Sequence, residues 1–178
     1  MTRKAIALSL LVLGLALVGC NERTDRSEGS VLLSVADFDS LPVQVSVTQG
    51  PFEIDGLVLR NIPKDPNGTT SDLQSIELRS YEIRYTRRDT GRRVPPSLVQ
   101  NIFSVVPVGG QITIDNLPIM LTNQLGNAPL KDLADFGADQ ETGTAVIVLN
   151  CSIRFFGRTL SGDNITSAPA SFTIEVVP

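Results

Sequence analysis

The sequence predicts an all-β chain, an antiparallel β-sandwich of about seven to nine strands. The first observation is the alternation of apolar and polar residues with a period of two, which is typical of strands that bury one face. The alternation is clearest over residues 43–48, 112–115 and 172–176. The second observation is that turn-forming stretches rich in Gly, Pro, Asn and Asp separate such segments. Only residues 128–138 have helical spacing of apolar residues, and they predict one short helical turn. Short strands without helices between them favour a sandwich over a parallel sheet.

The first residues are not part of that sandwich. Arg3 and Lys4 precede residues 5–18, a run of mostly Ala, Leu and Val without any charge. A short basic region before such a run is typical of a secretory signal peptide. The run is shorter than the roughly 20 residues of a comfortable membrane span.

The signal ends Leu17-Val18-Gly19-Cys20, which resembles the lipobox of bacterial lipoproteins. The resemblance implies that a diacylglycerol is attached to the Cys20 thiol, that a peptidase removes residues 1–19, and that the new amine is acylated. Such a protein is anchored to a membrane and does not span it. Asn21 stands where Asp favours the inner membrane, so the resemblance implies the outer membrane if the host has two. The alternative is an ordinary signal or short anchor with an incidental cysteine.

Three regions are therefore expected: residues 1–19 as the signal peptide, 20–30 as the lipidated cysteine with a flexible polar tether, and 31–178 as the sandwich. Whether residues 31–50 pair into its sheets or lie across them stays open. The net charge is −4, and removal of residues 1–19 leaves 13 basic and 19 acidic residues, a balance of −6. This balance argues against nucleic acid as a partner.

Residues 145–156, AVIVLNCSIRFF, predict a strand with one wholly apolar face that includes Ala145 and Cys151. Cys151 is then a small buried apolar residue with an inert thiol. The alternative, a reactive or ligand-binding thiol, needs an exposed and electropositive setting.

The spacing L-x-x-Y-x-I-x-Y at residues 78–85, followed by a polar stretch and Gly91, resembles the third strand and turn of fibronectin type III domains. Residues 161–163, with 167–169 and the last alternating strand, resemble the final hairpin of that family. The tryptophan expected on the second strand is absent. The resemblance implies a fibronectin-like or immunoglobulin-like sandwich, in a class of domains that usually act as binding modules and spacers.

Two loops are candidate binding sites. The turn at residues 87–93, RRDTGRR, is either a solvated hairpin tip or a contact site for the phosphate or carboxylate groups of an anion or partner. Its candidate contacts are Arg87, Arg88, Arg92 and Arg93. The loop DPNGTTSD at residues 65–72 carries Asp65, Asn67 and Asp72, oxygen-bearing side chains of the kind that calcium binds. The same residues suit a tight turn.

The chain contains no histidine. Ser-His-Asp and Cys-His catalysis are excluded, as is the commonest zinc ligand. No nucleophile motif or phosphate-binding loop is present, so we expect neither an enzyme nor a cofactor. The expected function is a membrane-anchored, non-catalytic binding or structural module of the cell envelope that docks a partner protein through a strand edge or loop tips. The alternative is a lipoprotein that binds a small ligand, an anionic polymer or calcium.

Overall fold

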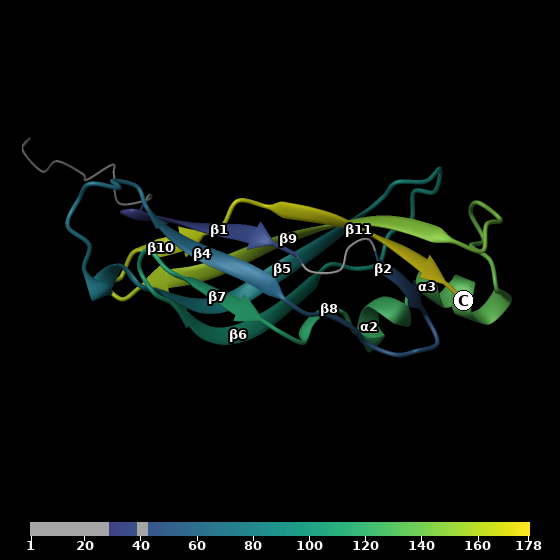
Figure 1. Cartoon of the computed structure of the whole chain (residues 1–178). Helices are drawn as coiled ribbons and strands as arrows, with labels where there is room; N and C mark the ends of the chain where they lie inside the picture. The colour runs from purple at the N-terminus through teal and green to yellow at the C-terminus, as the bar shows by residue number, and fades with distance from the viewer. Residues whose placement is uncertain (1–28, 39–42) are drawn as a thin grey trace, which may run out of the picture.

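A computed structural model describes residues 29–38 and 43–178 of the chain (Figure 1). The predicted signal peptide, Cys20 and the tether up to residue 28 lie outside the described residues. Within the described part, eleven strands and only three short helical segments are present. The prediction of an all-β, sandwich-like fold is confirmed.

Two layers of strands form the body of the fold, and Figure 1 shows the smaller layer lying over the larger one. The smaller layer has the order β1 (Val31–Asp37), β4 (Leu57–Pro63), β7 (Gln111–Ile114). The larger sheet has the order β2 (Val43–Ser46), β11 (Ala170–Val177), β9 (Ile147–Thr159), β5 (Ile76–Arg87), β6 (Leu98–Val106), and β10 (Asn164–Thr166) also pairs with β9. A separate two-stranded ribbon joins β3 (Phe52–Ile54) to β8 (Leu117–Met120).

The strand count exceeds the expected seven to nine because several strands are very short. β3 and β10 have three residues each, which is too few for an alternating pattern to be visible in the sequence. Residues 31–50 divide between the layers: β1 pairs antiparallel with β4, whereas β2 pairs parallel with β11. The first two strands therefore belong to opposite sheets of the sandwich.

The core lies between the two layers, and β9 runs through its middle. β9 is 13 residues long, pairs with β5 on one side and β11 on the other, and buries every second side chain. Cys151 is one of these side chains and is fully buried, as the alternation predicts. Ala145 does not belong to this face, because it is exposed and precedes the start of β9.

The predicted helical turn is α3 (Leu130–Phe136), which buries Leu130 and Leu133. Gly137 ends it in the left-handed conformation, with φ of 71°, and its N–H bonds the Leu133 carbonyl. The segments α2 (Thr122–Leu125) and the 3-10 turn η2 (Asp72–Gln74) were not predicted. Both are a single turn long, so neither leaves a helical period in the sequence.

Candidate functional site

The arginine turn, residues 87–93, packs against other parts of the fold, and Arg87 is the member of the turn whose side chain is buried. Its side chain is only 3% exposed. Nε donates to Asp89 over 2.6 Å and Nη2 donates to Asp139 over 2.9 Å. Nη1 donates to the Arg93 carbonyl at 3.3 Å. Each of the three guanidinium nitrogens therefore donates a hydrogen bond to another residue of the chain. The interpretation of this turn as a solvated tip is therefore wrong for Arg87.

Burial and hydrogen bonding act in opposite directions on the two carboxylates around Arg87. Burial alone raises the pKa of Asp139, but hydrogen bonds from Arg87, Thr142 and the Glu141 backbone lower it further than burial raises it. The pKa of Asp89 is also below its ordinary value, because bonds from Arg87 and two backbone N–H groups outweigh the cost of burial. Both groups therefore stay ionised and hold the cation in place.

The other end of the turn is tied to the loop that follows α3. The Glu141 carboxylate accepts the backbone N–H groups of Arg92 and Arg93 at 2.8 and 2.9 Å. The Arg93 guanidinium pairs with Asp132 at 3.2 Å. The guanidinium groups of Arg87 and Arg93 are thus matched by carboxylates of this chain, and binding of an external anion by the turn stays a prediction.

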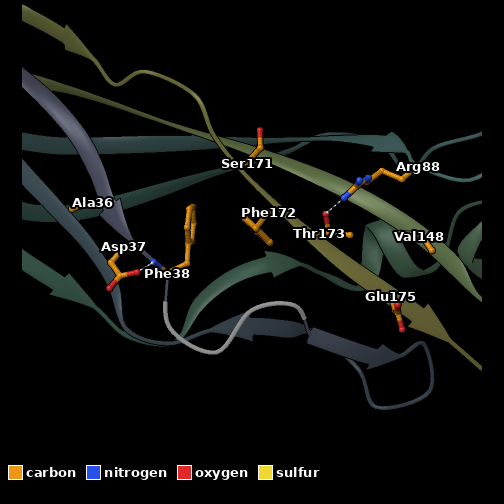
Figure 2. A pocket seen from close by; sticks show the side chains of 9 residues that line it. All are labelled: Ala36, Asp37, Phe38, Arg88, Val148, Ser171, Phe172, Thr173 and Glu175. Carbon is orange, nitrogen blue, oxygen red and sulfur yellow. Dashed lines mark hydrogen bonds between the residues drawn. The ribbon is translucent and has the colours of Figure 1, made fainter.

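Arg88 points into a pocket of about 660 Å³ between the end of β1 and residues 171–175 of β11 (Figure 2). Its Nη1 donates to the Thr173 hydroxyl over 3.0 Å, and its backbone N–H donates to the Val148 carbonyl. Arg88 is the one arginine of the turn that lines this pocket.

The pocket combines both charges with an aromatic wall. Phe38 and Phe172 pack with ring centroids 5.1 Å apart, and the carboxylates of Asp37 and Glu175 also line the space. Figure 2 shows Asp37 beside Phe38 and Glu175 below Arg88 on the other side. Such an arrangement suits a small ligand that carries a carboxylate together with an amine or an apolar group.

The predicted calcium loop has the geometry of a turn. The Asp65 carboxylate accepts the Asn67 N–H at 3.0 Å, and the Gly68 N–H approaches the Asp65 carbonyl at 3.3 Å. Asp72 instead begins η2, whose first turn is capped by Ser71. Across residues 29–38 and 43–178, no group of three or more Cys, Asp or Glu side chains is arranged to hold a metal ion.

Cys151 lies in the core and forms no disulfide. Burial raises the pKa of its thiol to about 12. The thiolate, which is the nucleophile and the metal ligand, is therefore strongly disfavoured at neutral pH.

The strand β6 is a candidate docking site that sequence reasoning missed. It is the last strand of the large sheet and pairs only with β5. Its outward side chains Val99, Phe103 and Val105 are 62%, 83% and 49% exposed. A groove of about 400 Å³ runs beside it, between residues 100–104 and residues 113–118.

The sequence contains an indication of this docking site, but the indication can be interpreted only when the order of the strands in the sheet is known. Residues 94–108 form a long stretch without a single charged residue. In a central strand such a stretch is ordinary, and at an edge it is unusual. Only the fold shows that β6 is an edge.

Comparison with protein-family models, with curated proteins and with solved structures finds no match to this chain. Among the residues that the structure describes, none of the helices is long and apolar enough to cross a membrane.

Proposed function

We propose that this chain is a lipid-anchored module of a bacterial cell envelope that binds another protein, without catalysis, along the free edge of β6. The observation that carries the proposal is an uncharged edge strand with exposed apolar side chains and an adjoining groove. An edge strand offers a row of unpaired N–H and C=O groups, to which an extended segment of a partner can add as a further strand.

The lipid anchor rests on the lipobox-like sequence that ends at Cys20. Nine backbone steps separate Cys20 from Gly29, where the described fold begins, and an extended chain of that length spans at most roughly 30 Å. The sandwich is then held close to the membrane surface and meets partners in the same envelope. The two packed sheets support a fibronectin-like or immunoglobulin-like domain, in agreement with a binding or spacer role.

A photo-crosslinking amino acid in intact cells tests the docking site. Phe103 is replaced by benzoylphenylalanine, and Phe136 on α3, which is 66% exposed, is replaced in the matched control. We expect a discrete adduct with an envelope protein from position 103 and none from position 136. Phe103→Lys or Val105→Lys places a charged side chain on the edge strand, which disfavours the addition of a further strand. Either variant should therefore compete poorly with the unsubstituted chain for the same partner. Equal labelling from both positions would count against a site at β6.

The anchor is tested separately with Cys20→Ser. We expect this change to abolish lipid labelling and to release the chain from membranes. Continued labelling contradicts the proposed lipid attachment but leaves the β6 edge untouched.

The second candidate function is small-ligand binding in the Arg88 pocket, favoured by a cation, two carboxylates and an aromatic wall around one space. Short dipeptides and inorganic phosphate are suitable probes in a thermal-shift assay. A rise in Tm that Arg88→Met abolishes would support this function. Calcium and a soluble polyanion belong in the same assay, with Asp65→Asn as the calcium control.

A further inference from the structure

β6 lacks most of the features that normally keep an edge strand from pairing with a second copy of itself. Edge strands are usually protected by charged side chains, proline, β-bulges or short length. β6 has nine residues, LVQNIFSVV, with no charge and no proline, and its one irregularity is a shift in its register with β5 between Asn101 and Ser104. The opposite edge of the same sheet, β2, has only four residues.

The sequence of β6 is also complementary to itself. When two copies run antiparallel about a two-fold axis at Ile102, all nine residues are paired without an overhang. Leu98 then lies opposite Val106, Val99 opposite Val105, and Gln100 opposite Ser104. These three kinds of pair match apolar with apolar and polar with polar residues, the remaining cross pair is Asn101 with Phe103, and no like charges oppose each other.

In this register the exposed side chains of both copies gather on one face. Val99, Phe103 and Val105 are separated by even numbers of residues, so they share the outward face of the strand. Phe103 lies opposite Asn101 of the other copy and diagonal to the second Phe103, a distance that aromatic side chains bridge. The six apolar side chains therefore bury one another around the axis.

We infer that two copies of this chain pair through β6, so that their large sheets become one continuous sheet across the dimer. The inference rests on the proposed docking role of the β6 edge and names a second copy as the occupant. A two-fold axis makes the interface isologous, as in most soluble dimers. Anchoring of both copies in one membrane raises their effective concentration and favours a pairing that is weak in dilute solution.

Residue-specific cross-linking in membranes tests the register. Val99→Cys and Val105→Cys are introduced singly and together into the full chain, and a short bismaleimide is added. Antiparallel pairing places position 99 next to position 105 of the other copy, whereas the two positions 99 lie about six residues, or roughly 20 Å, apart. Cys151 is buried and does not compete for the reagent.

The expected result is a covalent dimer from the double variant and from co-expressed single variants, and none from either single variant alone. Cross-linking of Val99→Cys to itself, or no dimer from the double variant, overturns the register and with it the proposed pairing.

Charge exchange tests the association without a cross-linker. The full chain is solubilised in detergent and its mass is measured by sedimentation. We expect the wild type to dimerise as its concentration is raised, and the Val99→Lys/Val105→Lys and Val99→Glu/Val105→Glu variants to be monomeric over the same range. Mixing the two charged variants should restore a dimer, because each lysine then faces a glutamate.

These outcomes separate the inference from the proposed function. A wild type that is monomeric, or charged variants that fail to associate when mixed, rules out self-pairing. An adduct between position 103 and a different envelope protein would still support the docking role of the edge. Val99 and Val105 are exposed, so circular dichroism should show that the variants keep their fold.

Discussion

The guanidinium of Arg87 and the carboxylate of Asp139 form an ion pair of 2.9 Å between residues 52 positions apart, and both side chains are almost completely buried. Asp139 lies at the start of the loop that links α3 to β9, so the pair fixes this loop to the end of β5. The Thr142 hydroxyl also donates to the Asp139 carboxylate at 2.7 Å, which gives this buried carboxylate a further hydrogen bond.

Loss of Arg87 should destabilise the protein strongly. Arg87→Met leaves Asp139 buried without a counter-ion, and breaking a buried pair in this way costs about 3–5 kcal/mol. Urea unfolding should show this loss, whereas Arg92→Met, at an exposed position of the same turn, should change stability by no more than about 0.5 kcal/mol. The double variant Arg87→Met/Asp139→Leu should recover part of the loss. Equal effects at positions 87 and 92 would contradict the buried pair.

The same pair predicts a loss of stability in acid. The pKa values of Asp89 and Asp139 are lowered in the folded protein, so folding favours their ionised forms. The resulting stabilisation is complete above the unfolded pKa of about 4 and is lost as the pH falls through the lower folded values. Unfolding free energy measured from pH 6 to pH 2 should fall over this interval. In Asp139→Asn the slope should be smaller, and an unchanged slope would remove Asp139 from the explanation.

Local sequence patterns predicted those features of the fold that depend only on residues close together in the chain. Period-two alternation is a local signal, and it placed Cys151 on the buried face of β9 correctly. The same reasoning could not distinguish Arg87 from Arg88, because both stand in the same cluster of charges. What separates them is Asp139, which becomes a neighbour of Arg87 only after the chain has folded.

The candidate docking edge at β6 also could not be identified from local sequence patterns. An uncharged strand indicates a central position as readily as an edge, and the difference depends on the strand order β9-β5-β6. That order depends on pairings between segments far apart in the chain. The pocket at Arg88 likewise needs Phe38 and Phe172 to meet across the two layers.

Gly157 should not tolerate a side chain. It lies on β9 opposite Leu78, where β5 contains an extra residue in its pairing. A Cβ atom at this position would come within 2.6 Å of the Glu77 carbonyl oxygen and 3.0 Å of Ile76. Because the first contact is with backbone of the central strand pair, Gly157→Ala should cost about 1–3 kcal/mol. Thermal unfolding measures the loss, and Ser152→Ala, on the same strand, serves as the control. A fully stable Gly157→Ala variant would contradict this close approach.

Thiol titration should distinguish the two cysteines. The Cys151 thiol is fully buried, and its pKa is raised to about 12, so a thiol reagent at pH 8 should not label it in the folded protein. After unfolding in guanidinium it should react at the ordinary rate. If Cys20 carries a lipid, the unfolded mature chain should contain one reactive thiol, although the sequence has two cysteines. Two reactive thiols would contradict lipid attachment, and rapid labelling of the folded chain would contradict the burial of Cys151.

The two tyrosines offer a direct optical probe of the core. The chain has two tyrosines and no tryptophan, so absorbance near 295 nm reports only Tyr81 and Tyr85. Both lie on β5 and hold β8: the Tyr81 hydroxyl donates to the Pro118 carbonyl over 2.6 Å, and the Tyr85 hydroxyl donates to the Ile119 carbonyl.

Burial raises the pKa of Tyr81 to about 12, with a smaller contribution from the charge of Glu53, and burial also raises the pKa of Tyr85. Since folding favours the protonated phenols, the stabilisation is complete below the unfolded pKa of about 10 and is lost as the pH rises through the folded values. We therefore expect little phenolate at pH 10.5, followed by ionisation that coincides with unfolding measured by circular dichroism. Tyr81→Phe, which leaves the Pro118 carbonyl without its donor, should lower stability by about 1 kcal/mol. Ionisation near pH 10 in a chain that remains folded would mean that these hydroxyls are open to solvent and that β8 is not held by β5.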